Sequence, residues 1–125
     1  MTKRVLDVGQ CNPDHASISR MLQEHFDVEI VRTHLPSDTL AALQDRDFDL
    51  VLINRKLDQD YSDGMNIVRS IKSDARLGQT PVMLVSNYPE AHETAMSAGA
   101  IYGFGKAELG SPEVIERLSA VLGDD

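Results

Sequence analysis

Short runs of apolar residues alternate along the chain with longer stretches in which apolar residues recur at helical spacing. The runs VLIN at 51–54 and PVMLVS at 81–86 are almost continuously apolar. Such runs are typical of strands that are covered on both faces in a parallel sheet. The pattern predicts strands at residues 4–8, 28–33, 50–54, 82–86 and 101–104.

A helix is predicted after each strand. The last is the clearest, because Val114, Leu118 and Leu122 follow the helical period and Ser111-Pro112 supplies a capping hydroxyl and a first-turn proline. The apolar stripes of the other four are Ile18, Met21, Leu22 and Phe26; Leu40 and Leu43; Met65, Ile67, Val68 and Ile71; and Ala91, Ala95 and Ala98. Five strand–helix alternations predict right-handed βαβ units and a doubly wound α/β domain over residues 1–125.

Composition narrows the class of protein. The chain is 42% apolar, which is enough for a core, and its net charge is −8. This charge argues against sequence-independent nucleic-acid binding and against docking to an anionic membrane surface. The first ten residues lack the apolar stretch of a signal peptide, and no segment is long and apolar enough to span a membrane. The single cysteine, Cys11, cannot form an internal disulfide, so we expect a cytoplasmic protein.

Several short segments occur in the order and near the spacing of a known family. They are NPDH at 12–15, FDLVLIN at 48–54, DG at 63–64, SDARLGQTPVMLVS at 73–86, AGA at 98–100, and Lys106. Together they resemble the receiver domain of bacterial response regulators over nearly the whole chain. The resemblance implies a flavodoxin-like, five-stranded parallel sheet in the order 2-1-3-4-5 with five helices.

In the family, a carboxylate at the end of the third strand accepts a phosphoryl group, and two acids after the first strand help to hold Mg²⁺. The resemblance places Asn54 at the acceptor position, and the acid pair falls at Gly9-Gln10 or Gln10-Cys11. A neutral carboxamide lacks the attacking anionic oxygen and is a poor Mg²⁺ ligand beside a carboxylate. We therefore expect neither a metal nor any other cofactor, and no phosphotransfer.

Two further family positions are retained, and one is lost. Ser86 and Lys106 match the residues that contact phosphoryl oxygens. One interpretation is that both residues bind phosphate. The other is that they hydrogen-bond each other and Asn54, or that Lys106 simply faces water. The family's switch aromatic falls at Gly103, which has no ring, and strand alternation predicts Tyr102 and Phe104 together on the opposite face. The loop from Arg55 to Asp63 is longer than usual.

The remaining candidates have ordinary structural explanations. Asp7, inside the first strand, is expected to reach a lysine or a helix end, since a buried carboxylate needs a partner. Cys11, His15 and His34 could all lie at the carboxyl edge of the sheet, but their spacing matches no zinc pattern. His92 is expected on the surface of the fourth helix. The sequence alone supports no Ser-His-Asp arrangement and no glycine-rich phosphate loop.

These observations favour a phosphorylation-independent pseudo-receiver that is not an enzyme and that binds a protein in bacterial signalling. The partner would be a signalling protein or a fused output domain, and the expected contact surface includes His92, Met96 and Tyr102. One alternative is a small-molecule- or anion-binding flavodoxin-like domain that uses the neutral pocket of Gln10, Asn54, Ser86 and Lys106. A conventional phosphorylated regulator is the remaining alternative.

Overall fold

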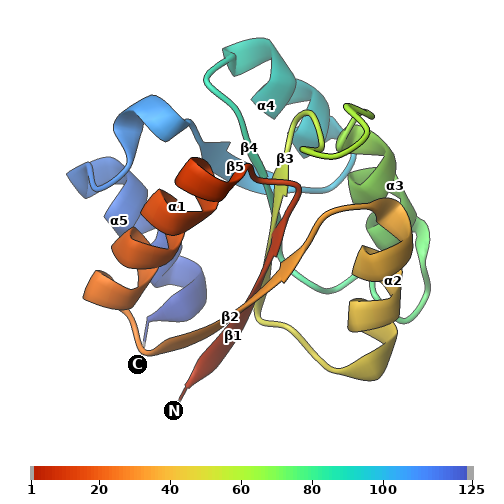
Figure 1. The fold of residues 1–125 in the computed structure, drawn as a ribbon, viewed down its shortest axis with the longest axis horizontal. Coiled ribbons are helices and arrows are strands. Elements are labelled where there is room, and N and C mark those ends of the chain that lie inside the picture. Colours follow the sequence, from red (N-terminus) through yellow and green to blue (C-terminus); the bar gives the residue numbers. More distant parts are fainter. Residues whose placement is uncertain (1, 124–125) are drawn as a thin grey trace.

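The computed structural model describes residues 2–123 and contains a five-stranded parallel sheet (Figure 1). The strands are β1 Lys3–Val8, β2 Val28–Thr33, β3 Leu50–Asn54, β4 Val82–Val85 and β5 Ile101–Phe104. Their order across the sheet, β2-β1-β3-β4-β5, confirms the predicted flavodoxin-like α/β fold. Each predicted strand boundary lies within one residue of the observed one, because the apolar runs are short and end at polar residues.

Five α-helices connect or follow the strands. They are α1 Asn12–His25, α2 Pro36–Asp45, α3 Met65–Ser73, α4 Pro89–Ser97 and α5 Pro112–Leu122, with a short 3₁₀ turn at Lys106–Glu108. All but α3 have a proline in the first turn, where its missing N–H costs no hydrogen bond. The predicted cap of α5 is present, since Ser111 Oγ accepts from the Val114 N–H at 3.4 Å.

The helices form a layer on each face of the sheet. Helices α1 and α5 cover one face, and α2, α3 and α4 cover the other (Figure 1). Successive side chains of a strand point to opposite faces, so Leu50 and Leu52 pack toward α1 and α5 while Val51 and Ile53 pack toward the other layer. This double burial explains why the central strands are continuously apolar.

The last strand departs from the predicted alternation. Tyr102 is 45% exposed at the open edge of the sheet, whereas Phe104 is completely buried. The register between β4 and β5 shifts, so that Met83 pairs with Ile101 but Val85 pairs with Phe104. This bulge re-aims the side chains on either side of Gly103. Tyr102 and Phe104, which strand alternation predicts on one face, therefore lie in different environments.

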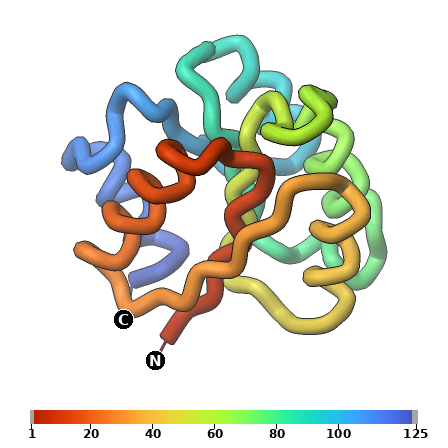
Figure 2. The backbone as a smooth tube through the Cα atoms, in the orientation of Figure 1, coloured from red at the N-terminus to blue at the C-terminus, as the bar shows by residue number. Residues whose placement is uncertain are grey.

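The carboxyl ends of the parallel strands meet at the upper edge of the molecule in Figure 1. Figure 2 shows the yellow-green segment after β3 arching over this edge before α3 begins. Open α/β sheets bind ligands at the carboxyl edge, so this is where a functional site is expected. Within residues 2–123, none of the helices combines the length and apolar character needed to cross a lipid bilayer.

Candidate functional site

Asn54, at the end of β3, is tied to two neighbouring loops. Its carboxamide nitrogen donates to the carbonyl oxygen of Gly9 at 3.1 Å and to that of Lys56 at 2.6 Å. Both amide protons are therefore used. This side chain fixes the loop after β1 and the loop after β3, and it carries no anionic oxygen that could attack phosphorus.

The loop after β1 contains no carboxylate at the positions where the resemblance places an acid pair. Gln10 is completely buried, and neither its amide nitrogen nor its amide oxygen has a hydrogen-bond partner within residues 2–123. Cys11 is exposed and donates to Asp14 at 3.1 Å. In the described part of the chain, no three His, Cys, Asp or Glu side chains gather closely enough to hold a metal ion. This donor set does not suit Mg²⁺, which prefers anionic oxygens.

Asp7 points from β1 toward α1 and is completely buried. Its carboxylate lies 2.6 Å from His15 Nδ1, so the partner of Asp7 is a histidine rather than the predicted lysine or helix end. Burial raises the pKa of the Asp7 carboxyl to about 6, although the hydrogen bond and charge of His15, the nearby Gln10 amide and the charge of Arg32 all act to lower it. The pair ties β1 to α1 beside the candidate site.

A third residue continues this pair into a line. Ser19 Oγ lies 3.4 Å from His15 Nε2, one helical turn along α1. The order Asp7, His15, Ser19 resembles a catalytic relay that the sequence alone did not suggest. However, 3.4 Å is long for a hydrogen bond to a nucleophile, and the backbone N–H groups around Ser19 are used within α1. Because the helical backbone around Ser19 leaves no N–H group for a developing oxyanion, the line fits a structural role.

Lys106 is neutralised by an acid that the sequence reasoning missed. Its ammonium lies 2.7 Å from Asp14, in the first turn of α1. Burial acts to raise the pKa of the Asp14 carboxyl, but contacts with Lys106 and Cys11 outweigh this effect and lower it. Ser86 Oγ accepts from the Tyr88 N–H at 3.1 Å. Within residues 2–123, Ser86 and Lys106 therefore bond neither each other nor Asn54, and Lys106 does not simply face water.

A cavity of about 360 Å³ lies between the loops that follow β3, β4 and β5. Its polar lining consists of Asn54, Arg55, Lys56, Ser86, Asn87, Tyr88 and Lys106, and we call it the basic cavity. The sequence reasoning recognised only Lys106 as a cation here. Arg55 and Lys56 directly follow Asn54 in the sequence. This adjacency could have predicted that they line the same cavity.

The expected partner face is partly different from the prediction. Met96 and Tyr102 are 49% and 45% exposed, but His92 is only 4% exposed, so its predicted surface position is wrong. His92 lies beside Ala95 on the packed side of α4, and its Nε2 donates to the carbonyl oxygen of Ser86 at 2.7 Å. Its ring contacts Tyr102, and the guanidinium of Arg117 lies 4.2 Å from the centre of the Tyr102 ring.

The loop after β3 is braced rather than open. Lys56 and Asp63 form an antiparallel bridge across it, and Asp58 pairs with His34 at 2.9 Å. Tyr61, at its tip, has φ +57 and is 74% exposed. Cys11, His15 and His34 thus each meet a different carboxylate, and the structure does not bring them together as one site.

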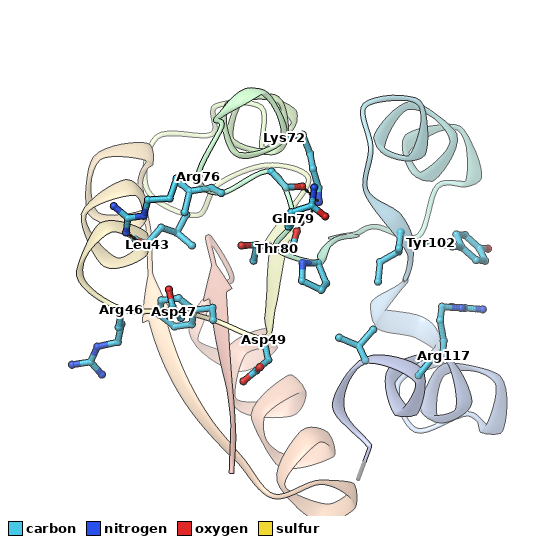
Figure 3. A pocket seen from close by; sticks show the side chains of 17 residues that line it. Leu43, Arg46, Asp47, Asp49, Lys72, Arg76, Gln79, Thr80, Tyr102 and Arg117 are labelled. Carbon is cyan, nitrogen blue, oxygen red and sulfur yellow. Dashed lines mark hydrogen bonds between the residues drawn. The ribbon is translucent and has the colours of Figure 1, made fainter. Parts of the chain in front are cut away.

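A larger groove of about 920 Å³ lies at the opposite, amino edge of the sheet (Figure 3). It contains several cations, but Arg46 and Arg117 point away from each other at its two ends (Figure 3). Lys72 donates to the carbonyl oxygens of Gly78 and Thr80, and burial lowers the pKa of its ammonium. Because Arg46 and Arg117 do not converge, they do not form an anion site in the groove.

No protein-family model matches the chain, and no curated protein matches it in sequence. Solved structures match its fold. A Chloroflexus aurantiacus protein described as a response regulator has a TM-score of 0.85 at 15% identity, with 99% of this chain and 100% of that one covered.

The signal receiver domain of a DNA-binding response regulator from Colwellia psychrerythraea has a TM-score of 0.79 at 18% identity, with 94% of this chain and 96% of that one covered. The chemotaxis response regulator CheY4 of Vibrio cholerae has a TM-score of 0.76 at 20% identity, with 98% and 100% covered. The chain therefore has the fold of response regulator receiver domains, over essentially its whole length.

Proposed function

We propose that this chain is a phosphorylation-independent receiver-like domain, comprising residues 1–125, that acts by binding a protein partner and not as an enzyme. The observation that carries the proposal is the state of Asn54. Its neutral carboxamide stands at the end of β3 and is committed to two backbone carbonyl groups. A receiver-like fold whose acceptor position serves as a structural brace retains its surfaces but has no chemistry to perform there.

The surroundings of Asn54 support the same conclusion. Phosphoryl transfer depends on positioning and on charge neutralisation by a metal and a lysine. Residues 9–11 offer no carboxylate for the metal, and Lys106 is engaged by Asp14 at 2.7 Å. The nucleophile and the metal ligands of phosphotransfer are therefore missing together, and the lysine at the family position is held by an acid.

We infer that the contact surface is the open side of β5 with the adjoining sides of α4 and α5, which we call the β5 face. Its exposed apolar residues are Met96, Ile101 and Tyr102. Met adapts its shape to a partner, and Tyr provides a large contact area at small entropic cost. Arg117, stacked on Tyr102, adds a charge at the rim. The partner would be another signalling protein or a fused output domain in a bacterial cytoplasm.

The proposal is tested by capturing the partner with the tagged chain in the native cell and then measuring affinity with purified components by calorimetry. Met96→Glu and Tyr102→Ala should each weaken binding by about tenfold or more. Met96→Glu should change stability by about 0.5 kcal/mol or less, whereas Tyr102→Ala should cost about 1–2 kcal/mol because it removes the ring contacts with His92 and Arg117. Tyr61→Ala is the matched control, because it removes an even more exposed tyrosine from the loop after β3. Loss of affinity in Tyr61→Ala alone would move the interface to that loop.

A further inference from the structure

We propose that the groove at the amino edge of the sheet binds an elongated small molecule that has an apolar body and one terminal carboxylate. This amino-edge groove lies between the loops that precede β3 and β4 on one side and β5 and α5 on the other (Figure 3). Its volume of about 920 Å³ is within the range of small-molecule sites. The groove is at the opposite edge of the sheet from Asn54, and the proposal does not depend on a protein partner.

The apolar body of the ligand matches the apolar lining of the groove. This lining comes from α2, the loops before β3 and β4, β5 and α5, and it consists mainly of Leu43, Phe48, Leu77, Pro81, Ile101 and Val121. Phe48 and Leu77 are buried, whereas Ile101 is 39% exposed and Val121 is half-buried. Apolar surface that remains exposed inside a concave site is typical of a ligand-binding groove, because a bound molecule removes it from water.

Lys72 supplies the cation for the carboxylate. Its ammonium donates to the carbonyl oxygens of Gly78 at 3.2 Å and Thr80 at 2.6 Å, which leaves one of its three protons free. The side chain runs from α3 toward Gln79 and Thr80 at the upper side of the groove in Figure 3. Lys72 forms no ion pair with the described residues, and burial lowers the pKa of its ammonium. A half-buried ammonium held only by neutral carbonyl groups lacks a counter-charge, which a ligand carboxylate would provide.

The other charges in the groove favour a molecule with one terminal charge over a compact anion. Arg46 and Arg117 lie at the two ends and do not converge (Figure 3). Asp47 and Asp49 line the lower side in Figure 3, away from Lys72. A carboxylate is therefore attracted to the Lys72 side and repelled from the opposite side. This separation orients an elongated molecule along the apolar lining.

The groove borders the β5 face, because Ile101, Tyr102 and Arg117 belong to both. A molecule held here would therefore touch the surface proposed for the protein partner. Its binding can nevertheless be measured on the chain alone, so failure of one proposal does not imply failure of the other.

The test is a titration of the purified chain with sodium octanoate, below the concentration at which it forms micelles and at constant ionic strength. Amide chemical shifts by NMR should show saturable changes at residues 46–49, 76–80 and 101–102, with a dissociation constant of about 1 mM or tighter. 1-Octanol has the same apolar chain without the charge. It should bind at the same residues but about fivefold or more weakly.

Variants separate the two parts of the site. Lys72→Met removes the charge and keeps the length of the side chain, so it should weaken octanoate by about fivefold or more and leave octanol unchanged. Ile101→Glu should weaken both ligands, because it places a charge on the apolar lining. Lys56→Met and Tyr61→Glu make similar changes at exposed residues of the opposite edge, and these controls should bind as the parent does. Thermal melting verifies folding, and Ile101→Glu with the octanoate–octanol comparison retains the test if Lys72→Met is unstable.

Three results would overturn the proposal. The first is the absence of saturable changes up to about 20 mM octanoate, or changes centred on residues outside the groove. The second is equal affinity for octanol and octanoate, or unchanged octanoate affinity in Lys72→Met, which would leave the groove to an apolar segment of a protein. The third is a shift of the same amides with protein concentration alone, which would show that a second copy of the chain occupies the groove.

Discussion

The buried ring of His92 packs edge-on against the exposed ring of Tyr102, with the ring centres 5.1 Å apart. The same histidine donates through Nε2 to the carbonyl oxygen of Ser86 at 2.7 Å. Because a carbonyl oxygen can only accept, Nε2 carries the proton. His92 thus connects the loop after β4, which lines the basic cavity, to the β5 face. Gly103, at the position of the family's switch aromatic, carries no ring. The aromatic contact beside β5 is instead made by His92 with Tyr102.

Replacing His92 tests this connection. His92→Ala should lower the free energy of unfolding by about 2–4 kcal/mol, because it leaves a cavity and an unpaired carbonyl group at Ser86. His92→Gln should recover part of the loss, since its amide can donate. Urea denaturation measures both, and His25→Ala, at an exposed position of α1, is the control. Equal stability of His92→Ala and His25→Ala would contradict the role of this side chain.

Much of the fold could be predicted from the sequence because β3 and β4 are buried on both faces. Such strands are apolar at nearly every position, and runs of four or five residues are too short for a buried helix. The helices were predictable for a related reason, since α5 presents Val114, Leu118 and Leu122 to the core and caps itself with Ser111. In these elements the local preferences, namely apolar spacing and helix capping, favour the same structure as the tertiary packing does. The spacing of apolar residues along the chain is therefore sufficient to identify them.

The errors arose where tertiary contacts decide the outcome. His92 was expected outside because the alanines of α4 suggested a narrow inner stripe, but His92 and Ala95 share the buried side and the Ser86 carbonyl group satisfies the ring. The shift of register at Gly103 depends on how β5 meets β4, and the glycine inside the strand was the one local signal for it. The partners of Asp7 and Lys106 lie on α1, and a list of residue types cannot show which acid meets which base.

We expect no phosphoryl adduct after incubation with acetyl phosphate and Mg²⁺, because Asn54 offers no nucleophile and residues 9–11 offer no metal ligand. Asn54→Asp alone should also remain unmodified, since the two further carboxylates are still missing. Intact-mass spectrometry detects the added phosphoryl group directly. A stoichiometric, Mg²⁺-dependent adduct on Asn54→Asp would show that another acid near β1 can hold the metal.

Gly103→Ala should be strongly destabilising, because a Cβ at this position would collide with the carbonyl oxygen of Leu84 in the neighbouring strand. We expect a loss of about 3 kcal/mol or more, since the backbone of β4 or β5 must shift. Gly110→Ala is the matched control. Gly110 has φ +82 with open space around it, so that variant should lose only about 1–2 kcal/mol from backbone strain. Similar losses in both variants, measured by chemical denaturation, would contradict the close approach of Gly103 to the Leu84 carbonyl group.

The stability of the protein should depend on pH through Asp7. Burial, opposed by His15 from α1, by Gln10 and by Arg32 from β2, raises the pKa of this carboxyl from 3.8 to about 6. The folded state therefore holds the Asp7 proton more tightly than the unfolded state does. Stability from this group is fully present below about pH 4 and is lost as pH rises through about 6. The shift corresponds to about 3 kcal/mol at most.

Asp7→Asn removes this titration, so the variant should gain stability relative to the parent as pH rises from about 4 to about 7. Urea denaturation at several pH values across this window measures the difference. Asp14→Asn is the control of opposite sign. Contacts with Lys106 and Cys11 lower the pKa of the Asp14 carboxyl, so its contribution is present above the unfolded-state pKa and is lost as pH falls. A stability difference between Asp7→Asn and the parent that stays constant across the window would mean that burial does not control the ionisation of Asp7.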